Sequence, residues 1–343
     1  MTRMHTLLLL IAVTALTGCG DEVRKPGMGN GAPATLCLIR TTPVKDHGHS
    51  SLCWLYAMLA TIESDRLMMG DSVNLSPLFP ARYMLERQAV DYYMTVGEAY
   101  IGTRGVMTMA PELINTAGLT HYDAYQPDVN INALCRKIER AADNALKKKS
   151  GITTLQGKIS DIIDDNMHPA PTNVYMFGVE YTPQEFARSV AKPGSYKAFT
   201  SFTHHPFGTA FALEIPDNRN GDLYMNVPID TLQALIDSTL LSGRAVCWEG
   251  DTSDGGFAFR KGFAMLENDG DSVTQERRQH DFETFDTTDD HCMEIVGMAR
   301  GDDGTPYYIC KNSWGDGNAF GGFMYMSANY LRLRTIAVMM IAP

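Results

Sequence analysis

The feature that most constrains this chain is a strand–turn–strand pattern close to its C-terminus. His291 opens an apolar run that reaches residue 299, Gly-Asp-Asp-Gly follows at 301–304, and residues 307–311 form a second apolar run. Two such runs around a Gly-containing turn predict an antiparallel hairpin. Asn312 directly follows the second run, so the hairpin places it beside His291 although the two are far apart in the sequence. The next apolar segment, residues 323–326, is expected to extend the same sheet.

A second chemically distinctive segment surrounds Cys53. A polar, Gly-containing loop precedes this residue, and a helix-like stretch follows it as far as Gly70, a natural helix end. A thiol at a helix start faces unpaired backbone N–H groups and the positive end of the helix dipole, and both favour the thiolate. Cys53 is therefore a candidate nucleophile, although Cys-Trp at a helix start, taken alone, is more often a packing feature.

The rest of the chain predicts an α+β fold in which helices precede strands. Residues 43–170 are mainly helical and residues 171–343 are strand-rich, with a cleft expected between the two lobes. Expected helices cover residues 84–93, 111–117, 131–149, 159–167 and 229–242, and expected strands cover residues 173–178, 245–248 and 330–341.

Composition excludes two broad classes of protein. The chain has 343 residues, 44% of them hydrophobic, which is too apolar for general disorder. Its net charge of −11 is opposite to the basic footprint of a nucleic-acid binder. The one dense basic run, Lys147 to Lys149, lies in an expected helix and is interpreted as a solvated face.

The N-terminus is typical of an exported protein. Thr6 to Leu16 form an apolar run that is shorter than the ~20 residues of a membrane-spanning helix and fits a secretory signal. Leu16-Thr17-Gly18-Cys19 follows and resembles the bacterial lipobox. That resemblance implies a signal peptide at 1–18, a lipid on Cys19, and a tether with a first strand at 19–42. The mature chain would then be a membrane-anchored lipoprotein of the bacterial cell envelope, facing the periplasm or the cell surface. An ordinary signal peptide with an incidental Cys19 remains the alternative.

The other cysteines leave the disulfide state open. Apart from Cys19 there are six, which permit fifteen complete pairings. Cys247 and Cys310 lie inside apolar runs, and buried free thiols are the interpretation favoured for them.

The residues around Cys53, His291 and Asn312 together resemble a known family. The order Cys-Trp, strand-opening His and Lys-Asn-Ser-Trp-Gly resembles that of papain-like cysteine peptidases, at both ends of the mature chain. Within that group, Ser50 to Trp54 resembles the Ser-Ser-Gly-Arg-Cys-Trp segment of the bleomycin hydrolase and aminopeptidase C branch. Residues 181–186 and 226–230 resemble its central region. Compact papain-like enzymes separate Cys and His by ~130–150 residues, whereas about 240 separate them here, which indicates an insertion.

The resemblance implies a two-lobe papain-like fold and a role for each matching residue. Cys53 would be the nucleophile, and His291 would hold its proton and later protonate the leaving amine. Asn312 would orient the imidazole, and Trp314 would shield their bond from water. Asp290 could favour the imidazolium, although a solvated loop acid is the equal alternative. The substrate would be a peptide or protein, and no cofactor is needed.

One position departs from the family pattern. Six residues before the nucleophile the family carries a Gln that helps to bind the oxyanion, and here that position is His47. An imidazole N–H can also donate, so the function can survive and become pH-dependent. The substitution also makes a weak or inactive enzyme conceivable. His47 and His49 lack further ligands at a usable spacing, so no metal is expected. The pair His204-His205 is interpreted as a surface or structural feature.

Two further expectations concern substrate binding. Gly102 and Gly105 lie where related enzymes run a Gly-rich segment beside the cleft, whose backbone can pair with an extended substrate; a plain loop is the alternative. In the resembling branch a C-terminal carboxylate captures the substrate's free amine. Here Ala342 and Pro343, the residues after the last expected strand, are too short to cross a cleft. Relaxed aminopeptidase action is expected, with the acidic stretch Glu267 to Asp271 as a possible substitute.

Three functions therefore remain open at this point. The first is an active exported cysteine peptidase, and the second is an inactive or weak peptide-binding lipoprotein of the same fold. The third is a different Cys–His enzyme that cleaves cell-wall amides, although that class usually lacks Asn-Ser-Trp-Gly. Side-chain preference and oligomeric state are not encoded in any motif found here.

Overall fold

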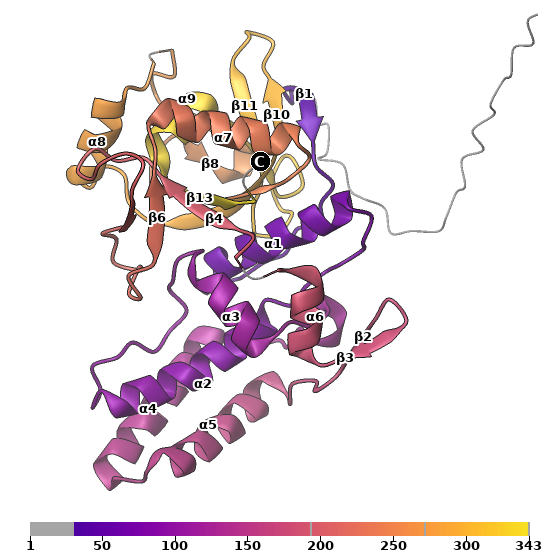
Figure 1. Ribbon diagram of the computed structural model, residues 1–343, viewed down its shortest axis with the longest axis vertical. Helices are drawn as coiled ribbons and strands as arrows, with labels where there is room; N and C mark the ends of the chain where they lie inside the picture. The colour runs from indigo at the N-terminus through magenta and orange to yellow at the C-terminus, as the bar shows by residue number, and fades with distance from the viewer. Residues whose placement is uncertain (1–30, 193, 271, 342–343) are drawn as a thin grey trace, which may run out of the picture.

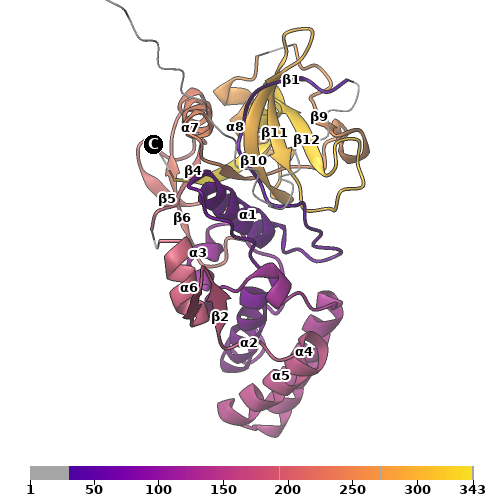
Figure 2. The same cartoon turned by 90° about the vertical axis from the view of Figure 1, so that its right-hand side faces the viewer.

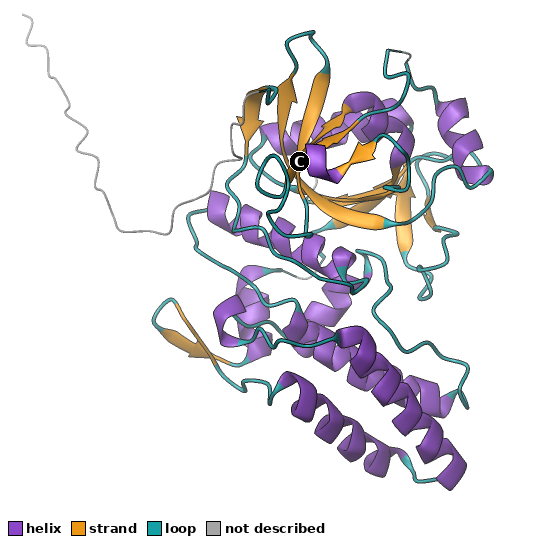
Figure 3. Cartoon of the chain, turned by 180° about the vertical axis from the view of Figure 1, so that it is seen from behind, coloured by secondary structure: helices purple, strands orange, loops and turns teal. Residues whose placement is uncertain are grey.

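The computed structural model describes residues 31–341 except 193 and 271, and in it the chain folds into a helical part and a sheet-rich part. Figure 1 shows the sheet with α7, α8 and α9 in its upper half and α2, α4 and α5 at its base, with α1 between them. Seen from behind, the strands gather in the upper half, apart from the small hairpin of β2 and β3 (Figure 3). The signal peptide and Cys19 lie outside the described residues.

The helical part is built from amphipathic helices that share one core. These helices are α1 (Cys53–Met68), α2 (Leu78–Met94), α3 (Met109–Ala117), α4 (Ile131–Lys148), α5 (Ile152–Met167) and α6 (Pro183–Val190), with a short 3-10 turn at Tyr122–Ala124. Both α2 and α5 begin earlier than the sequence pattern predicts. In α5, Gly157 is accommodated within the helix, where Leu155, Ile159 and Ile163 form a buried stripe.

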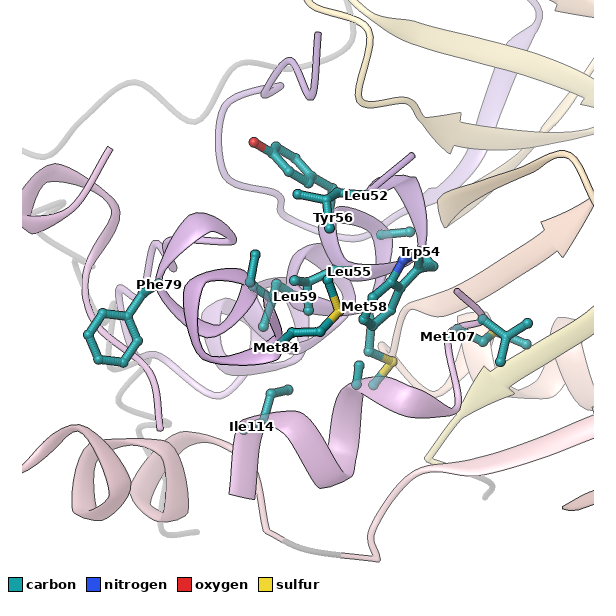
Figure 4. Packing of buried hydrophobic residues seen from close by; sticks show 14 of the residues in the cluster. Leu52, Trp54, Leu55, Tyr56, Met58, Leu59, Phe79, Met84, Met107 and Ile114 are labelled. Atoms are coloured by element: carbon teal, nitrogen blue, oxygen red, sulfur yellow. The ribbon is translucent and has the colours of Figure 1, made fainter. Parts of the chain in front are cut away.

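Helix α1 is buried on nearly every side. Its residues from Trp54 to Asp65 are all buried, because the helix is covered by the sheet on one side and by other helices on the other. Figure 4 shows Trp54 and Met58 of α1 packed among the side chains of Met84 in α2 and Ile114 in α3. Burial of this kind contributes roughly 25 cal/mol per Å² of apolar surface, so the position of α1 is strongly fixed.

Most strands form one large sheet. Its order is β5-β6-β4-β13-β7-β10-β11-β12-β9-β8, with β1 also paired to β10. All pairs are antiparallel except β4 with β6 and β9 with β12. The strands are β1 (Ala34–Leu38), β4 (Lys197–Thr200), β5 (Ala210–Ala212), β6 (Leu223–Asn226), β7 (Val246–Gly250), β8 (Phe257–Ala258), β9 (Phe263–Ala264), β10 (His291–Arg300), β11 (Pro306–Lys311), β12 (Phe323–Ser327) and β13 (Thr335–Met340).

The remaining elements cover the sheet or connect the two parts. Helices α7 (Ile229–Leu241), α8 (Gln275–Glu283) and α9 (Ala328–Arg334) accompany the strands, with a 3-10 turn at Phe259–Lys261. Strands β2 (Val174–Met176) and β3 (Val179–Tyr181) form a separate hairpin. The sequence places the change of lobe near residue 170, but α6 still packs on α3, and the large sheet takes up the chain from β4 onward (Figure 2).

The last expected strand, residues 330–341, is wrong in its first half. Residues 328–334 form α9 instead, and β13 begins only at Thr335. The cause is local, because the Ser327 side chain accepts a hydrogen bond from the Tyr330 backbone N–H and so caps a helix start. The hairpin of β10 and β11 is confirmed, as is the antiparallel pairing of β11 with β12.

Candidate active site

Cys53 is the first residue of α1. The preceding residue, Leu52, provides no side-chain cap, and the first turn carries no acidic residue. The backbone N–H groups of the first helical turn point toward the helix start, where they favour negative charge. The helix thus begins at Cys53, where the sequence pattern places its start.

His291 and Asn312 lie side by side where β10 begins and β11 ends. Their side chains are joined by a hydrogen bond of 2.7 Å between His291 Nε2 and Asn312 Oδ1, and both residues are almost fully buried. The Ser313 backbone N–H also donates to Asn312 Oδ1, at 2.7 Å, which identifies that atom as the oxygen. An amide oxygen only accepts, so His291 carries a proton on Nε2 and leaves Nδ1 for a second partner.

That second partner is Cys53, which lies close to two side chains of β10. The pKa of the Cys53 thiol is well below its ordinary value, chiefly because Cys292 donates a hydrogen bond to it. Burial opposes this shift, while the hydrogen bond and positive charge of His291 support it. Burial raises the pKa of Cys292 itself, so that residue stays protonated and serves as the donor. The arrangement favours a thiolate–imidazolium pair.

Trp314 joins the two sides of the site. Its ring lies against that of His291, with 4.5 Å between the centroids, and so covers the bond between His291 and Asn312. The indole N–H also donates to His47 Nε2 at 3.0 Å, a contact that the sequence pattern does not reveal. The backbone N–H of His47 donates to the Ser313 carbonyl, which fixes the loop before α1 against the end of β11.

His47 is held as a neutral imidazole with one free donor. Because Nε2 accepts from Trp314, the ring proton resides on Nδ1. Burial lowers the pKa of His47, and the charge of His291 adds to this effect against the opposing thiolate of Cys53. Among the described residues Nδ1 has no hydrogen-bond partner, although it is buried. The loop therefore presents an unused N–H group beside the nucleophile.

The other predicted site residues occupy less distinctive positions. Asp290 is exposed, and its carboxylate accepts a hydrogen bond from the Thr288 hydroxyl. Gly102 donates its N–H to Gln88 Oε1, so that group is already occupied, and Gly105 packs closely on the Trp54 ring. Their roles in substrate binding stay a prediction. Asp269 is bound to Ser327, at the end of β12 opposite to Phe323, so this part of the acidic stretch lies away from the site.

Two side-chain groups in the described part of the chain have the composition of a metal site, and neither includes Cys53, His291 or Asn312. They are His204-His205-Glu214 and His280-Asp281-Asp286. In the first, both imidazoles bind the Glu214 carboxylate. Gln279 Nε2 contacts His204 Nδ1, so the proton of His204 lies on Nε2, the atom that would have to bind a metal. A hydrogen-bonded cluster fits this arrangement better than a metal centre.

Comparison with known proteins finds one family match and several chains of similar structure. Residues 172–340 match the Peptidase C1-like family. PepW from Lactobacillus rhamnosis has a similar structure, with a TM-score of 0.69 and 17% sequence identity over 91% of this chain and 83% of PepW. The chain thus has the papain-like α+β fold. No curated protein matches the sequence significantly.

Two more distant structures also resemble the chain. One comes from a study of the mite allergens Blo t 1 and Der p 1, with a TM-score of 0.45 and 16% identity over 92% of this chain and 73% of that one. The other is the bromelain protease from Ananas comosus, with a TM-score of 0.38 and 15% identity over 87% of this chain and 92% of that one.

Removal of the Cys292 thiol should change the pH dependence of the nucleophile. Without the donor, the Cys53 thiolate loses its main stabilising contact, so its pKa should rise and alkylation should require a higher pH. The midpoint of the iodoacetamide alkylation rate against pH is expected to move upward in Cys292→Ala. Cys310→Ala, which removes a buried thiol elsewhere in the sheet, should keep the original midpoint. An unchanged profile for Cys292→Ala would contradict the assigned role.

Proposed function

We propose that this protein is a cysteine peptidase in which Cys53, His291 and Asn312 form the catalytic triad. The observation that carries the proposal is the contact of one imidazole with both partners, Asn312 through Nε2 and Cys53 on its other side. These groups come from three separate elements, and a purely structural role does not require a low-pKa thiol at that position. The family match of residues 172–340 and the papain-like fold support it.

The proposed reaction proceeds through a thioester. The Cys53 thiolate attacks the peptide carbonyl carbon, and the carbonyl electrons move to the oxygen to give a tetrahedral oxyanion. His291 then gives its proton to the leaving amine as the C–N bond breaks, which leaves an acyl-enzyme. Water attacks the thioester while His291 accepts its proton, and the breakdown of the second intermediate releases the acid and restores the thiolate. Asn312 keeps the imidazole in place throughout.

His47 is proposed to stabilise the oxyanion. It takes the position where the resembling family carries Gln, and its Nδ1–H is a buried donor without a partner among the described residues. A donor that is already free of competing bonds costs no reorganisation when charge develops on the substrate oxygen. The presence of His47 where the family carries Gln is also the observation that favours the second candidate function. That candidate is a weakly active or inactive peptide-binding protein of this fold.

We also propose that the mature protein is a lipoprotein of the bacterial envelope, anchored through Cys19. The support is the order of apolar run, Leu-Thr-Gly-Cys and Gly-rich tether in the sequence. Within the described residues, none of the helices combines the length and apolar character needed to cross a bilayer. The branch resemblance to bleomycin hydrolase and aminopeptidase C likewise stays a proposal, and it rests on the motifs around Cys53 and in the central region.

Replacement of the nucleophile should abolish hydrolysis. In Cys53→Ala, kcat for peptide substrates is expected to fall by roughly 10⁴–10⁶-fold, as loss of a covalent nucleophile does in related chemistry. Labelling by a peptide epoxide, followed by mass spectrometry, should disappear as well. Cys37→Ala is the matched control, since Cys37 is also a free and partly exposed thiol. Full activity in Cys53→Ala would exclude the assignment, and intact labelling without turnover in the parent would favour the peptide-binding alternative.

A His47 series separates oxyanion binding from simple packing. His47→Ala should lower kcat by roughly 10²–10³-fold with a small change in KM, the usual cost of one such donor. His47→Gln should retain or raise activity, because its amide also donates. The pH profile of kcat is measured as well. Burial lowers the pKa of His47, so its imidazole is a neutral donor in the parental enzyme. Parental turnover in the Ala variant would mean that His47 does not bind the oxyanion.

The anchor can be tested in cells. Cys19 should be acylated and the protein should sediment with the membrane fraction, whereas Cys19→Ala should be released or mis-sorted, because one residue carries the lipid. Mass spectrometry of the mature N-terminus measures the modification directly. An unmodified mature N-terminus at another residue would show that the segment is an ordinary signal peptide.

A further inference from the structure

A large pocket lies beside the proposed catalytic residues and has an unusual charge distribution. Its volume is about 640 Å³, and it is lined by Arg104 from the helical part and by His204 and residues 214–216, 282, 283, 285 and 287–290 from the sheet-rich part. Asp289, on its wall, is two residues before His291. Apolar side chains such as Ile215, Phe282 and Phe285 line the same pocket. The pocket thus combines an apolar lining with a carboxylate close to the reaction centre.

A second acid lies buried behind Asp289. Glu249 is on β7 opposite Cys292 of β10, on the sheet face that packs against α1. Its side chain is fully buried, and neither carboxylate oxygen receives a hydrogen bond from a donor group of the described residues. Oδ2 of Asp289 is equally buried and lacks a donor in the same part of the chain. Two carboxyl groups therefore face each other without a cation.

Electrostatics places this acid pair next to the nucleophile. Burial is the main cause that raises the pKa of Glu249, and the neighbouring Asp289 raises it further. The pKa of Asp289 is raised to about 7, again mainly by burial. The Cys53 thiolate contributes to both shifts, so it lies close to both carboxyl groups. Both shifts favour a protonated carboxyl group in this pair when no cation is present.

Other buried acids in the described part of the chain have a cation or hydrogen-bond donors beside them; Asp65, for example, accepts hydrogen bonds from the Tyr196 hydroxyl and the Ala245 N–H. Glu63 binds Lys45 at 2.6 Å, and Glu294 lies 3.6 Å from Lys311. Arg104, which lines the pocket, has Asp217 as its main partner, to which its Nε donates at 2.9 Å, and the charge of Asp289 acts on it more weakly. Unpaired buried carboxyls are costly, and removing them from a sheet interior would relieve that cost. Their presence beside a nucleophile is explained if a ligand supplies the missing positive charge.

We propose that Glu249 and Asp289 bind a cationic group of the peptide substrate, which makes this pocket a specificity site. The inference rests on the proposed function, whose substrate class it narrows. The apolar lining suits the methylene stem of a Lys or Arg side chain, and the acid pair suits its charged end. A free amino terminus has the same charge chemistry, and the experiment separates the two sources.

The test measures equilibrium binding in the Cys53→Ala variant, so that no turnover is needed. Calorimetry compares acetylated alanine tetrapeptides with one Arg, placed at each position in turn, against peptides in which neutral citrulline replaces Arg. A third set has a free amino terminus and citrulline. We expect at least tenfold tighter binding for Arg at one position. Tight binding of the third set alone would identify the amino terminus as the bound cation and would equally support the acid pair.

Variants of the pocket test whether Glu249 and Asp289 cause the preference for cationic peptides. Glu249→Gln and Asp289→Asn, each combined with Cys53→Ala, should reduce the preference for cationic peptides to less than about threefold. Glu283→Gln is the matched control, because Glu283 lines the same pocket but is exposed. Circular dichroism checks the fold, and Asp289→Asn decides the matter if Glu249→Gln does not fold.

Several outcomes would overturn the inference without touching the proposed function. Equal affinity for Arg and citrulline peptides, no measurable binding of any cationic peptide, or an unchanged preference in Asp289→Asn would each exclude a cation site. Hydrolysis of neutral and cationic peptides at equal kcat/KM by the parent enzyme would do the same while leaving the peptidase intact. Conversely, cation-selective binding in a protein whose Cys53→Ala variant still hydrolyses peptides would refute the catalytic assignment alone.

Discussion

The packing of α1 against β10 is the interaction on which the rest of this structure depends. The first residue of α1 is Cys53 and the first residue of β10 is His291, so the contact between these elements sets the geometry of the pair. Buried charge reinforces it, because Glu63 of α1 and Lys311 of β11 are both hydrogen-bonded to Thr42. Removing one member of such a network leaves an unpaired buried charge, which is strongly destabilising. The segment before the nucleophile is thereby tied to both parts of the fold.

Much of the architecture could be predicted because it is encoded locally. The apolar runs around the Gly-Asp-Asp-Gly turn are sufficient for the hairpin of β10 and β11, and Gly118 ends α3 as its position in the sequence indicates. The exchange of a strand for α9 came from a single cap, where the Ser327 hydroxyl competes successfully with the strand pattern that follows. Such a cap is a weak signal in a sequence pattern, although it contributes about 1 kcal/mol to the stability of the folded protein.

Only the proposed catalytic residues of the site could be predicted from the sequence. Cys53, His291 and Asn312 could be found because two short motifs contain them, and the structure brings them together. Glu249 could not be found, since its role depends on the register of β7 against β10 and on the residues that happen to face it. Cys292 could be read only as another buried thiol, although it directly follows His291. The bond from Trp314 to His47 likewise depends on tertiary structure alone.

The buried face shared by α1 and the sheet also changes how the cleft should be understood. Cys247, Cys292 and Met339 of the sheet belong to the same continuous hydrophobic cluster as Met84, Ile138 and Ile159 of the outer helices. The cleft therefore lies over a core that α1 shares with the sheet, while a second cluster, which includes Trp248 and Ile295, fills the other face of the sheet. Opening the lobes would expose apolar surface that neither side can cover by itself. The two lobes should therefore unfold as one cooperative unit, in which packing of the helical bundle stabilises the position of the nucleophile.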